Sequence, residues 1–431
     1  MTEKVTPIFI QRLFCGLGLF LLALPLRGQS ARSLSLTDVL RGVQQYSPLL
    51  RAEQLNIGLA QTDVITAGLR PNPLLNNQTL QLARPSVYPE GTGPFSSVNR
   101  QVWWQVTTPI NVAQQRQKSV RLAEQTVELT RRNVAEVERN LLLQVAQTWL
   151  SAWNARRSLD LIAQSQQNLD TLVRLSEVRL RNQVITQTDL LRTQVLADQY
   201  RLRGRTARQE YVNQLADLRR LLNTTDSIDI AVTNELGILE NRFQGLLSDS
   251  TQVQALRNRS DVRVVQQAVE VARQNSQLQQ ALRYPRPELG VIYNPQNSVP
   301  YMGFYGTLPL PFFNKNQGNI QRAKLAEDQT RQVAAFTQRQ VETEVQIALR
   351  SFQTQQGNLS RYVGIRERAA QVLASVRYAY LRGGTTIVDF LDAQRSLLAV
   401  QEDYLATEVA YRQSLIQLLF VTGQIQRFDT P

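Results

Sequence analysis

The amino-acid sequence predicts a duplicated chain of long helices and short strands, whose strands form a membrane β-barrel only when several copies assemble. Three observations predict this fold. Two stretches of roughly seventy residues have the apolar spacing of a coiled coil, the same order of elements occurs twice, and each half contains two alternating strands of about ten residues. Each half therefore has the order helix, strand, strand, long helix, turn, helix.

Residues 1–30 have the pattern of a signal peptide. Lys4 and Arg12 precede an apolar run from Leu13 to Leu26, and small or polar residues at 28–31 supply a cleavage region. A retained anchor is the less favoured alternative, because a membrane-spanning helix needs about twenty residues. The only cysteine, Cys15, lies inside the run, so we expect a mature chain without disulfides or an attached lipid.

Composition excludes several classes of function. The formal net charge is +13, but the arginines are spread along the helices among glutamines, which favours a solvated helical surface over nucleic-acid binding. Histidine is absent, and no glycine-rich phosphate loop or cluster with metal-ligand spacing is present. The sequence therefore predicts neither an enzyme nor a bound metal or cofactor.

The first structural repeat is expected over residues 31–223. An amphipathic helix opened by Ser35 or Thr37 is interrupted near Ser47-Pro48 and ends at Pro71-Asn72-Pro73. Alternation of apolar and polar residues then predicts strands at about 74–84 and 98–108, joined by a loop rich in Pro, Gly and Ser.

A long helical hairpin follows at 113–223. Its turn lies at 182–187, where Thr186 or Thr188 can cap the returning helix. At ~1.5 Å per residue, each long arm spans about 100 Å, so we expect it to line something extended. The apolar seam of the first arm comprises Leu141, Val145, Thr148, Ala152, Ala155, Leu159, Ile162, Gln166, Leu169, Val173, Ser176 and Leu180.

The second repeat is expected over 260–423, after a linker at 224–259 without clear periodicity and before a tail at 424–431. Its strands fall at about 288–297 and 301–310, and its long hairpin at 316–423. Gly383 and Gly384 allow the reversal at the second tip. The apolar seam of its first arm comprises Val345, Leu349, Phe352, Gln356, Leu359 and Val363.

The two hairpins superpose at an offset of about two hundred residues, which indicates an internal duplication. The matching pairs are Asp189 with Asp389, Gln194 with Gln394, Tyr211 with Tyr411, Leu215 with Leu415, Leu218 with Leu418, and Asn223 with Gly423.

Strands of ten residues with one apolar face suit a membrane barrel, although a soluble hairpin is an equally good interpretation of the pattern alone. Four strands cannot close a barrel, since about eight is the practical minimum, and unpaired edges are not viable in lipid. Several copies must therefore pool their strands, and three copies supply twelve.

The sequence resembles the TolC-type outer-membrane efflux channels over its whole mature length, and most closely the CzcC-type branch that serves heavy-metal efflux. The motifs that carry this resemblance are Ser47-Pro48, residues 68–73, the proline- and Asn-Gln-Gly-Asn-containing stretch 308–320, Tyr380 with Gly383-Gly384, residues 388–394, Tyr404, Tyr411, Leu418 and Gly423.

The resemblance implies a homotrimer in the outer membrane. Its twelve-stranded barrel, with four strands from each chain, would continue as a long α-helical barrel in the periplasm. A periplasmic adaptor and an inner-membrane pump of the RND type are the implied partners, and metal cations or small toxic compounds the implied cargo.

Asp389 and Asp392 are the candidate entrance residues. They lie three apart on a helix and can face one side, so three chains would place six carboxylates around one constriction. Such a ring attracts cations and raises the proton affinity of its members by mutual repulsion. The alternative is a carboxylate favoured by the positive end of the helix dipole, followed by a solvated aspartate. The resemblance assigns both residues to the acidic periplasmic entrance.

The resemblance also implies a gate lock between the two tips. Asp189 and Tyr380 match the family's aspartate and tyrosine, but Thr385 occupies the position of its arginine. Arg382 and Arg192 are the candidate substitutes. The tip turns at Gly383, Gly384, Val184 and Thr186 are the expected docking points for the adaptor.

Two alternatives remain at this point. The same tips would suit an outer-membrane duct for type I protein secretion. An exported coiled-coil scaffold would use the heptads for self-association only, but it leaves the strand hairpins and the duplication without a purpose.

Overall fold

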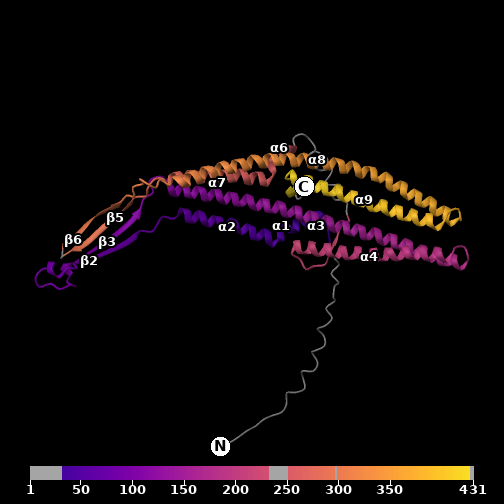
Figure 1. Cartoon of the computed structure of the whole chain (residues 1–431), viewed down its shortest axis with the longest axis horizontal. Coiled ribbons are helices and arrows are strands. Elements are labelled where there is room, and N and C mark those ends of the chain that lie inside the picture. Colours follow the sequence, from indigo (N-terminus) through magenta and orange to yellow (C-terminus); the bar gives the residue numbers. More distant parts are fainter. Residues whose placement is uncertain (1–31, 233–250, 297–298, 428–431) are drawn as a thin grey trace, which may run out of the picture.

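The computed structural model describes residues 32–232, 251–296 and 299–427. The expected signal peptide with Cys15, residues 233–250 of the linker, residues 297–298 and the last four residues lie outside the described residues. The chain is an elongated body with a β-sheet at one end and the turns of two long helical hairpins at the other (Figure 1).

Two helices with only Ser47 between them follow a short strand at 32–34. Helix α1 (Leu36–Tyr46) starts with a capping box between Ser35 and Asp38. Helix α2 (Pro48–Gly68) starts directly afterwards, because Ser47 caps it and Pro48 occupies its first turn, where no N–H is needed. The expected interruption at Ser47-Pro48 is therefore a change of helix.

A four-stranded antiparallel sheet combines both repeats. Its order is β2 (Leu74–Gln81), β3 (Arg100–Pro109), β5 (Glu288–Gln296) and β6 (Val299–Thr307). Strand β6 ends earlier than the expected 310, because Pro309 and Pro311 have no N–H for a ladder. The contact between β3 and β5 joins the first repeat to the second.

The register aligns apolar side chains from all four strands on one face of the sheet. Leu75, Val106, Val291 and Phe304 form one row, and Trp104, Tyr293 and Met302 form the next. This face is open to the surroundings: Met302 is 82% exposed and Phe304 is 96% exposed. A single chain thus presents a sheet whose apolar side nothing in the described chain covers.

Two long helical hairpins form the rest of the body. They are α3 (Gln115–Arg181) with α4 (Gln187–Leu222), and α8 (Gln317–Leu381) with α9 (Ile387–Val421). Helix α7 (Ser260–Ala281) lies against α3 and α8, as α2 lies against α3 (Figure 1). The predicted unit of helix, two strands, long helix, turn and helix is confirmed in both halves.

The main hydrophobic core surrounds the middle of α3. Trp149 and Trp153 are almost completely buried there, although they lie outside the predicted seam. The reason is that α1, α4, α7 and α9 all contact α3, so the helix buries a wider face than a two-stranded coiled coil does. A second cluster near the hairpin turns includes Leu169, Leu196, Tyr380 and Phe390.

The linker is more regular than its sequence indicates. Strand β4 (Ile228–Ile230) pairs in parallel with β1 (Arg32–Leu34), and helix α6 (Thr251–Asn258) precedes α7. Strands of three residues are too short for a periodic signal, so the sequence did not predict β1 or β4. Beyond α9, a 3₁₀ turn at Ile425–Arg427 packs Ile425 into the core.

A buried group of ion pairs fastens the helix ends at the middle of the body. Arg259, which is 3% exposed, binds Asp261 at 2.6 Å and Glu344 of α8 at 2.7 Å. Arg139 of α3 binds Glu136 at 2.8 Å and donates to the carbonyl oxygen of Phe420 at 3.2 Å. Burial raises the pKa of Asp261, but the guanidiniums of Arg259 and Arg139 outweigh it, so this pKa lies below its usual range.

Among the described helices, none has the length and apolar character of a membrane span.

Candidate functional site at the hairpin tips

The two hairpin turns are built from the same local contacts. Thr186 caps α4 through a reciprocal pair of hydrogen bonds with Asp189, and Thr386 caps α9 through the same pair with Asp389. Of the two expected caps for α4, Thr186 is therefore the one used. Each turn also contains a left-handed residue, Gln183 at φ 58° and Gly383 at φ 78°. The duplication thus extends to backbone conformation.

Asp389 is held by its own helix start. Its Oδ2 atom accepts hydrogen bonds from the Thr386 hydroxyl at 2.6 Å, the Thr385 hydroxyl at 2.7 Å and the Thr386 N–H at 3.1 Å. These donors favour the ionised form, so the hydroxyl of Thr386, followed by that of Thr385, lowers the pKa of Asp389. Asp392 lies one turn further along α9 and is exposed. The helix start therefore presents two carboxylates, of which one already has three donors.

The residues of the expected gate lock have other partners within one chain. Asp189 binds Thr186, and Thr385 donates to Asp389, so the threonine at the arginine position belongs to the cap. The guanidinium of Arg382 lies 4.3 Å from the ring of Tyr378, and Arg192 is exposed on α4. In the described part of a single chain, Asp189 and Tyr380 share no hydrogen bond.

Tyr380 is instead held from the neighbouring hairpin by Arg179, a residue that the sequence did not single out. The guanidinium of Arg179 lies 4.6 Å from the centre of the Tyr380 ring, and its Nη1 atom donates to the Tyr380 carbonyl oxygen at 3.5 Å. The Tyr380 ring also stacks on Phe390 at 5.3 Å. The hydroxyl of Tyr380 is buried and has no partner among the described residues.

A signal for this contact exists in the duplication. At an offset of two hundred residues, Arg179 corresponds to Ala379 and Tyr380 corresponds to Leu180. At these two positions the repeats differ: the first repeat supplies the cation, Arg179, and the second supplies the aromatic ring, Tyr380. A cation and an aromatic ring are the two partners of a cation–π contact.

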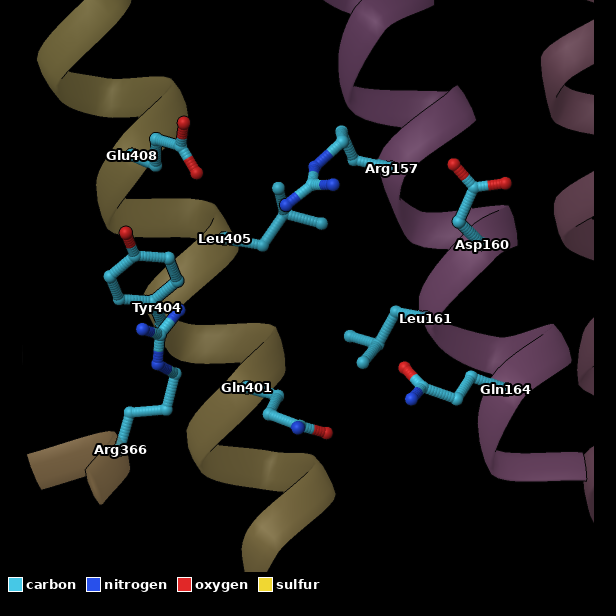
Figure 2. A pocket seen from close by; sticks show the side chains of 9 residues that line it. All are labelled: Arg157, Asp160, Leu161, Gln164, Arg366, Gln401, Tyr404, Leu405 and Glu408. Carbon is cyan, nitrogen blue, oxygen red and sulfur yellow. The ribbon is translucent and has the colours of Figure 1, made fainter. Parts of the chain in front are cut away.

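The hairpins are separated by small cavities along their length. One of about 200 Å³ lies beside Tyr380 and Phe390. Another, of about 240 Å³, lies midway along the body, where Leu161 of α3 and Leu405 of α9 extend into the space between the two helices (Figure 2). Arg157, Asp160, Glu408 and Arg366 border this second cavity, and Arg366 stacks on Tyr404 at 4.5 Å. These charged and aromatic groups line the contact between the two hairpins. They include no nucleophile paired with a base, as a catalytic site for nucleophilic chemistry would need.

Among the described residues, no three or more carboxylate, thiol or imidazole side chains come together in a way that suits a metal ion.

Comparisons with known proteins agree with this architecture. The family model of the outer membrane efflux proteins matches residues 39–224 and 252–424. Among solved structures, a membrane protein from Pseudomonas aeruginosa has a TM-score of 0.75 at 17% identity, with 91% of each chain covered. CusC has a TM-score of 0.75 at 17% identity, covering 92% of this chain and 95% of CusC.

The outer-membrane protein VceC from Vibrio cholerae has a TM-score of 0.70 at 17% identity, covering 90% of this chain and 96% of VceC. No curated protein matches at a significant level. The resemblance found in the sequence is thus confirmed at the level of the family, while the CzcC branch stays a prediction. The chain belongs to the outer membrane efflux protein family, whose members are transport channels of the outer membrane and not enzymes.

Proposed function

We propose that three copies of this chain form the exit duct of a tripartite efflux system. The duct crosses the outer membrane as a twelve-stranded barrel and continues into the periplasm as a helical barrel. It receives cargo from an inner-membrane pump of the RND type through a periplasmic adaptor.

The observation that carries this proposal is the incomplete sheet. Strands β2 and β6 are its two edges, and no described strand pairs with their free sides. Its apolar face is exposed as well. In lipid, every backbone N–H and C=O needs a partner, so the free edges must pair with those of other copies. Three copies give an even number of strands, well above the minimum for closure.

The long helices support the same assembly. Helix α8 has no buried side chain between Phe352 and Tyr380, although its predicted seam extends into this stretch at Gln356, Leu359 and Val363. Val372, which lies outside that seam, is also apolar and is 56% exposed. A helix of this length with a half-exposed seam needs a further helix against it, and the hairpins of neighbouring copies supply one.

The entrance chemistry supports a cationic cargo. Three copies bring Asp389 and Asp392 together as six carboxylates at the tips, and such a ring favours multivalent cations. Together with the CzcC-like motifs, this favours divalent metal ions among the substrates of the pump. The exposed turns around Val184, Thr186, Gly383 and Gly384 form the docking surface for the adaptor.

Four measurements test the proposal, the first two of them on the full-length mature protein. The mass of the detergent-extracted particle should be that of three chains, and the particle should form a conducting pore in planar bilayers. A deletion strain should become sensitive to metal ions or drugs, and the adaptor and pump should co-purify with a tagged chain.

Other outcomes would contradict it. A lone subunit in detergent, or release from the membrane by carbonate washing, would indicate a scaffold instead. A deletion strain that exports metals and drugs normally but retains a secreted protein would indicate a type I secretion duct.

A further inference from the structure

Four segments that connect the strands to the helices have an unusual charge. Residues 68–73, 110–118, 282–287 and 308–318 contain no Asp or Glu. The whole chain has 48 basic and 35 acidic residues, so this imbalance is not a property of its average composition. We name these segments the junction collar. Its cations are Arg70, Arg116, Lys118, Arg283, Arg286 and Lys315.

The junction collar is one continuous band. Arg116 donates to the Gly68 carbonyl oxygen at 3.0 Å, which ties the start of α3 to the end of α2. The buried side chain of Gln115 donates to the Tyr284 carbonyl oxygen at 2.9 Å, and Asn316 donates to that of Gln279 at 2.9 Å. These bonds join segments 68–73, 110–118 and 282–287 directly. They attach 308–318 to the end of α7, which leads into 282–287, where the sheet meets the helices (Figure 1).

The cations of the collar lack acidic partners. Arg70, Arg283, Arg286 and Lys315 are exposed, and among the described residues none of the six collar cations forms an ion pair. The Nε atom of Arg286 donates a hydrogen bond to the Oε1 atom of Gln115 at 3.2 Å. A groove of about 420 Å³ lies between two of the segments, bordered by Arg70 and Arg116 together with Asn111, Gln114 and Gln117. It therefore gathers two guanidiniums and three amide side chains.

Apolar side chains accompany these cations. Tyr284, Leu310, Phe312 and Phe313 are exposed in the collar, and Phe313 is 96% exposed. Exposed aromatic rings beside basic residues, next to an apolar strand face, are typical of a membrane–water interface. Because the strands lie in the outer membrane and the helices extend into the periplasm, the collar lies at the periplasmic leaflet.

We propose that the junction collar binds the phosphate headgroups of anionic phospholipids in the periplasmic leaflet. A phosphate matches the bidentate geometry of arginine, and the rings and strand face next to the collar accept the acyl chains. The proposal rests on the placement of the strands in the membrane, which it shares with the proposed function, but not on the cargo of the duct. Absence of a lipid preference in the wild type, with normal conductance, would therefore count against this proposal alone.

The test compares lipid retention by the assembled protein. The protein is reconstituted into nanodiscs of phosphatidylcholine with phosphatidylglycerol as a minor component, then extracted, and the lipids retained are counted by native mass spectrometry. Arg70→Gln, Arg283→Gln and Lys315→Gln are combined in one variant, because the side chains of these three residues form no hydrogen bond among the described residues. The matched control combines Arg205→Gln, Arg208→Gln and Arg361→Gln, exposed positions on α4 and α8.

The wild type and the control should retain phosphatidylglycerol over phosphatidylcholine, and the collar variant should lose this preference by about fivefold for each cation removed from a bound lipid. Inorganic phosphate at about 50 mM should not displace the lipid, because it lacks acyl chains. Equal retention of the two lipids by the wild type, equal losses in both variants, or displacement by inorganic phosphate would overturn the proposal. Conductance of the same preparations reports separately on the duct.

Discussion

At the scale of single residues, Asp389 is part of the capping box at the start of α9. Three donors from Thr385 and Thr386 hold its carboxylate, as the helix-start alternative predicts, and the ring of carboxylates stays a prediction. The cap lowers the pKa of Asp389, whereas a ring of carboxylates in the assembly would raise it. The carboxylate of Asp392 accepts no hydrogen bond from the described residues, so Asp392 is the cleaner probe of the ring.

We expect Asp392→Asn to weaken the block of the pore by multivalent cations, because it removes three of the six proposed ring charges without disturbing the cap. Asp389→Asn combined with it should weaken the block further. The measurement is the blocking concentration of a trivalent cation in planar bilayers. Glu367→Gln, an exposed carboxylate on α8 far from the turn, is the control. Unchanged block in the double variant would rule out the ring.

Arg179 and Tyr380 provide a second prediction at this scale. Arg179→Gln removes a cation–π contact of about 1 kcal/mol, so it should shift any equilibrium between closed and open tips about fivefold towards the open state. The measurement is single-channel open probability, with Arg181→Gln, an exposed neighbour, as control.

Tyr380→Phe separates this contact from the proposed gate lock. It keeps the ring and removes only the hydroxyl, which has no partner among the described residues of one chain. Little change in open probability would mean that Arg179 alone holds the tips. An increase would show that the hydroxyl binds Asp189 or another group in the assembly.

The residue-level site was only partly predictable. Capping follows local rules, so a Thr three positions before an Asp marks both turns in the sequence. The partner of Tyr380 lies 201 residues earlier, and only the mismatch between the repeats indicates it. Burial of the Tyr380 hydroxyl depends on how two hairpins pack, which no local pattern specifies.

At the scale of elements, the sheet depends on one glycine where the two repeats meet. Gly290 of β5 pairs with Thr107 of β3, and a Cβ atom at this position would lie 2.1 Å from the Val106 carbonyl oxygen. No residue with a Cβ atom fits this approach without moving the backbone. Gly303 of β6 has more room, since its nearest neighbour would be the Ile292 side chain at 3.4 Å.

We therefore expect Gly290→Ala to disrupt pairing between β3 and β5 and to lower the yield of assembled protein in the membrane severalfold. Gly303→Ala should assemble nearly normally. Both are measured as the fraction of chain that resists extraction and migrates as the full assembly without heating. Equal assembly of the two variants would show that the sheet adjusts freely at Gly290.

The ion pairs around Arg259 yield a prediction about stability. Arg259→Gln removes the buried partner of Glu344 and the closer of the two guanidiniums beside Asp261, and loss of one member of a buried pair costs about 3 kcal/mol. Arg273→Gln removes a surface pair with Glu270 and should cost less than about 1 kcal/mol. Denaturant unfolding followed by the Trp149 and Trp153 fluorescence compares the two.

The same cluster predicts a response to acid. Because the folded-state pKa of Asp261 is lowered, its contribution to stability is complete above its unfolded pKa of about 3.9 and is lost as pH falls through the lower, folded value. Asp261→Asn should therefore be less stable at pH 7 and should approach the wild type as the pH falls further below the unfolded pKa of aspartate. A constant difference between the two across this range would contradict the assignment.

The elements themselves were largely predictable, because long helices and alternating strands repeat their signal many times. The elements that the sequence missed are short: β1, β4 and α6 lie near chain segments without periodicity, and their formation depends on burial of Leu34, Ile228 and Ile230 beneath distant helices. Wide burial around Trp149 was missed for a related reason. The number of helices that contact α3 is a tertiary property.

At the scale of the whole molecule, one chain is an incomplete wall. Its sheet has two free edges, and the middle of α8 has a seam that its own chain half covers. The hydrophobic cores lie around the middle of α3 and near the turns, so the chain can fold before it assembles. Assembly then depends on surfaces that contribute little to the stability of a single chain.

We expect Val372→Asp to weaken assembly of the trimer while leaving the fold of the chain intact, because it places a charge on an exposed apolar position of α8. Gln371→Asp, at the adjacent exposed position, should assemble normally. Particle mass in detergent and circular dichroism together measure assembly and fold. A Val372→Asp trimer of normal stability would place this position away from the subunit contacts.

The parallel pairing of β1 with β4 has a consequence for biogenesis. Residues 32–34 find their partner only at 228–230, on the far side of the first hairpin. During export from the amino end, residues 32–34 therefore cross the inner membrane first. They have no strand to pair with until nearly two hundred further residues have crossed. During that interval the segment is an adhesive strand edge, and a periplasmic chaperone that shields such edges has a defined period in which to act.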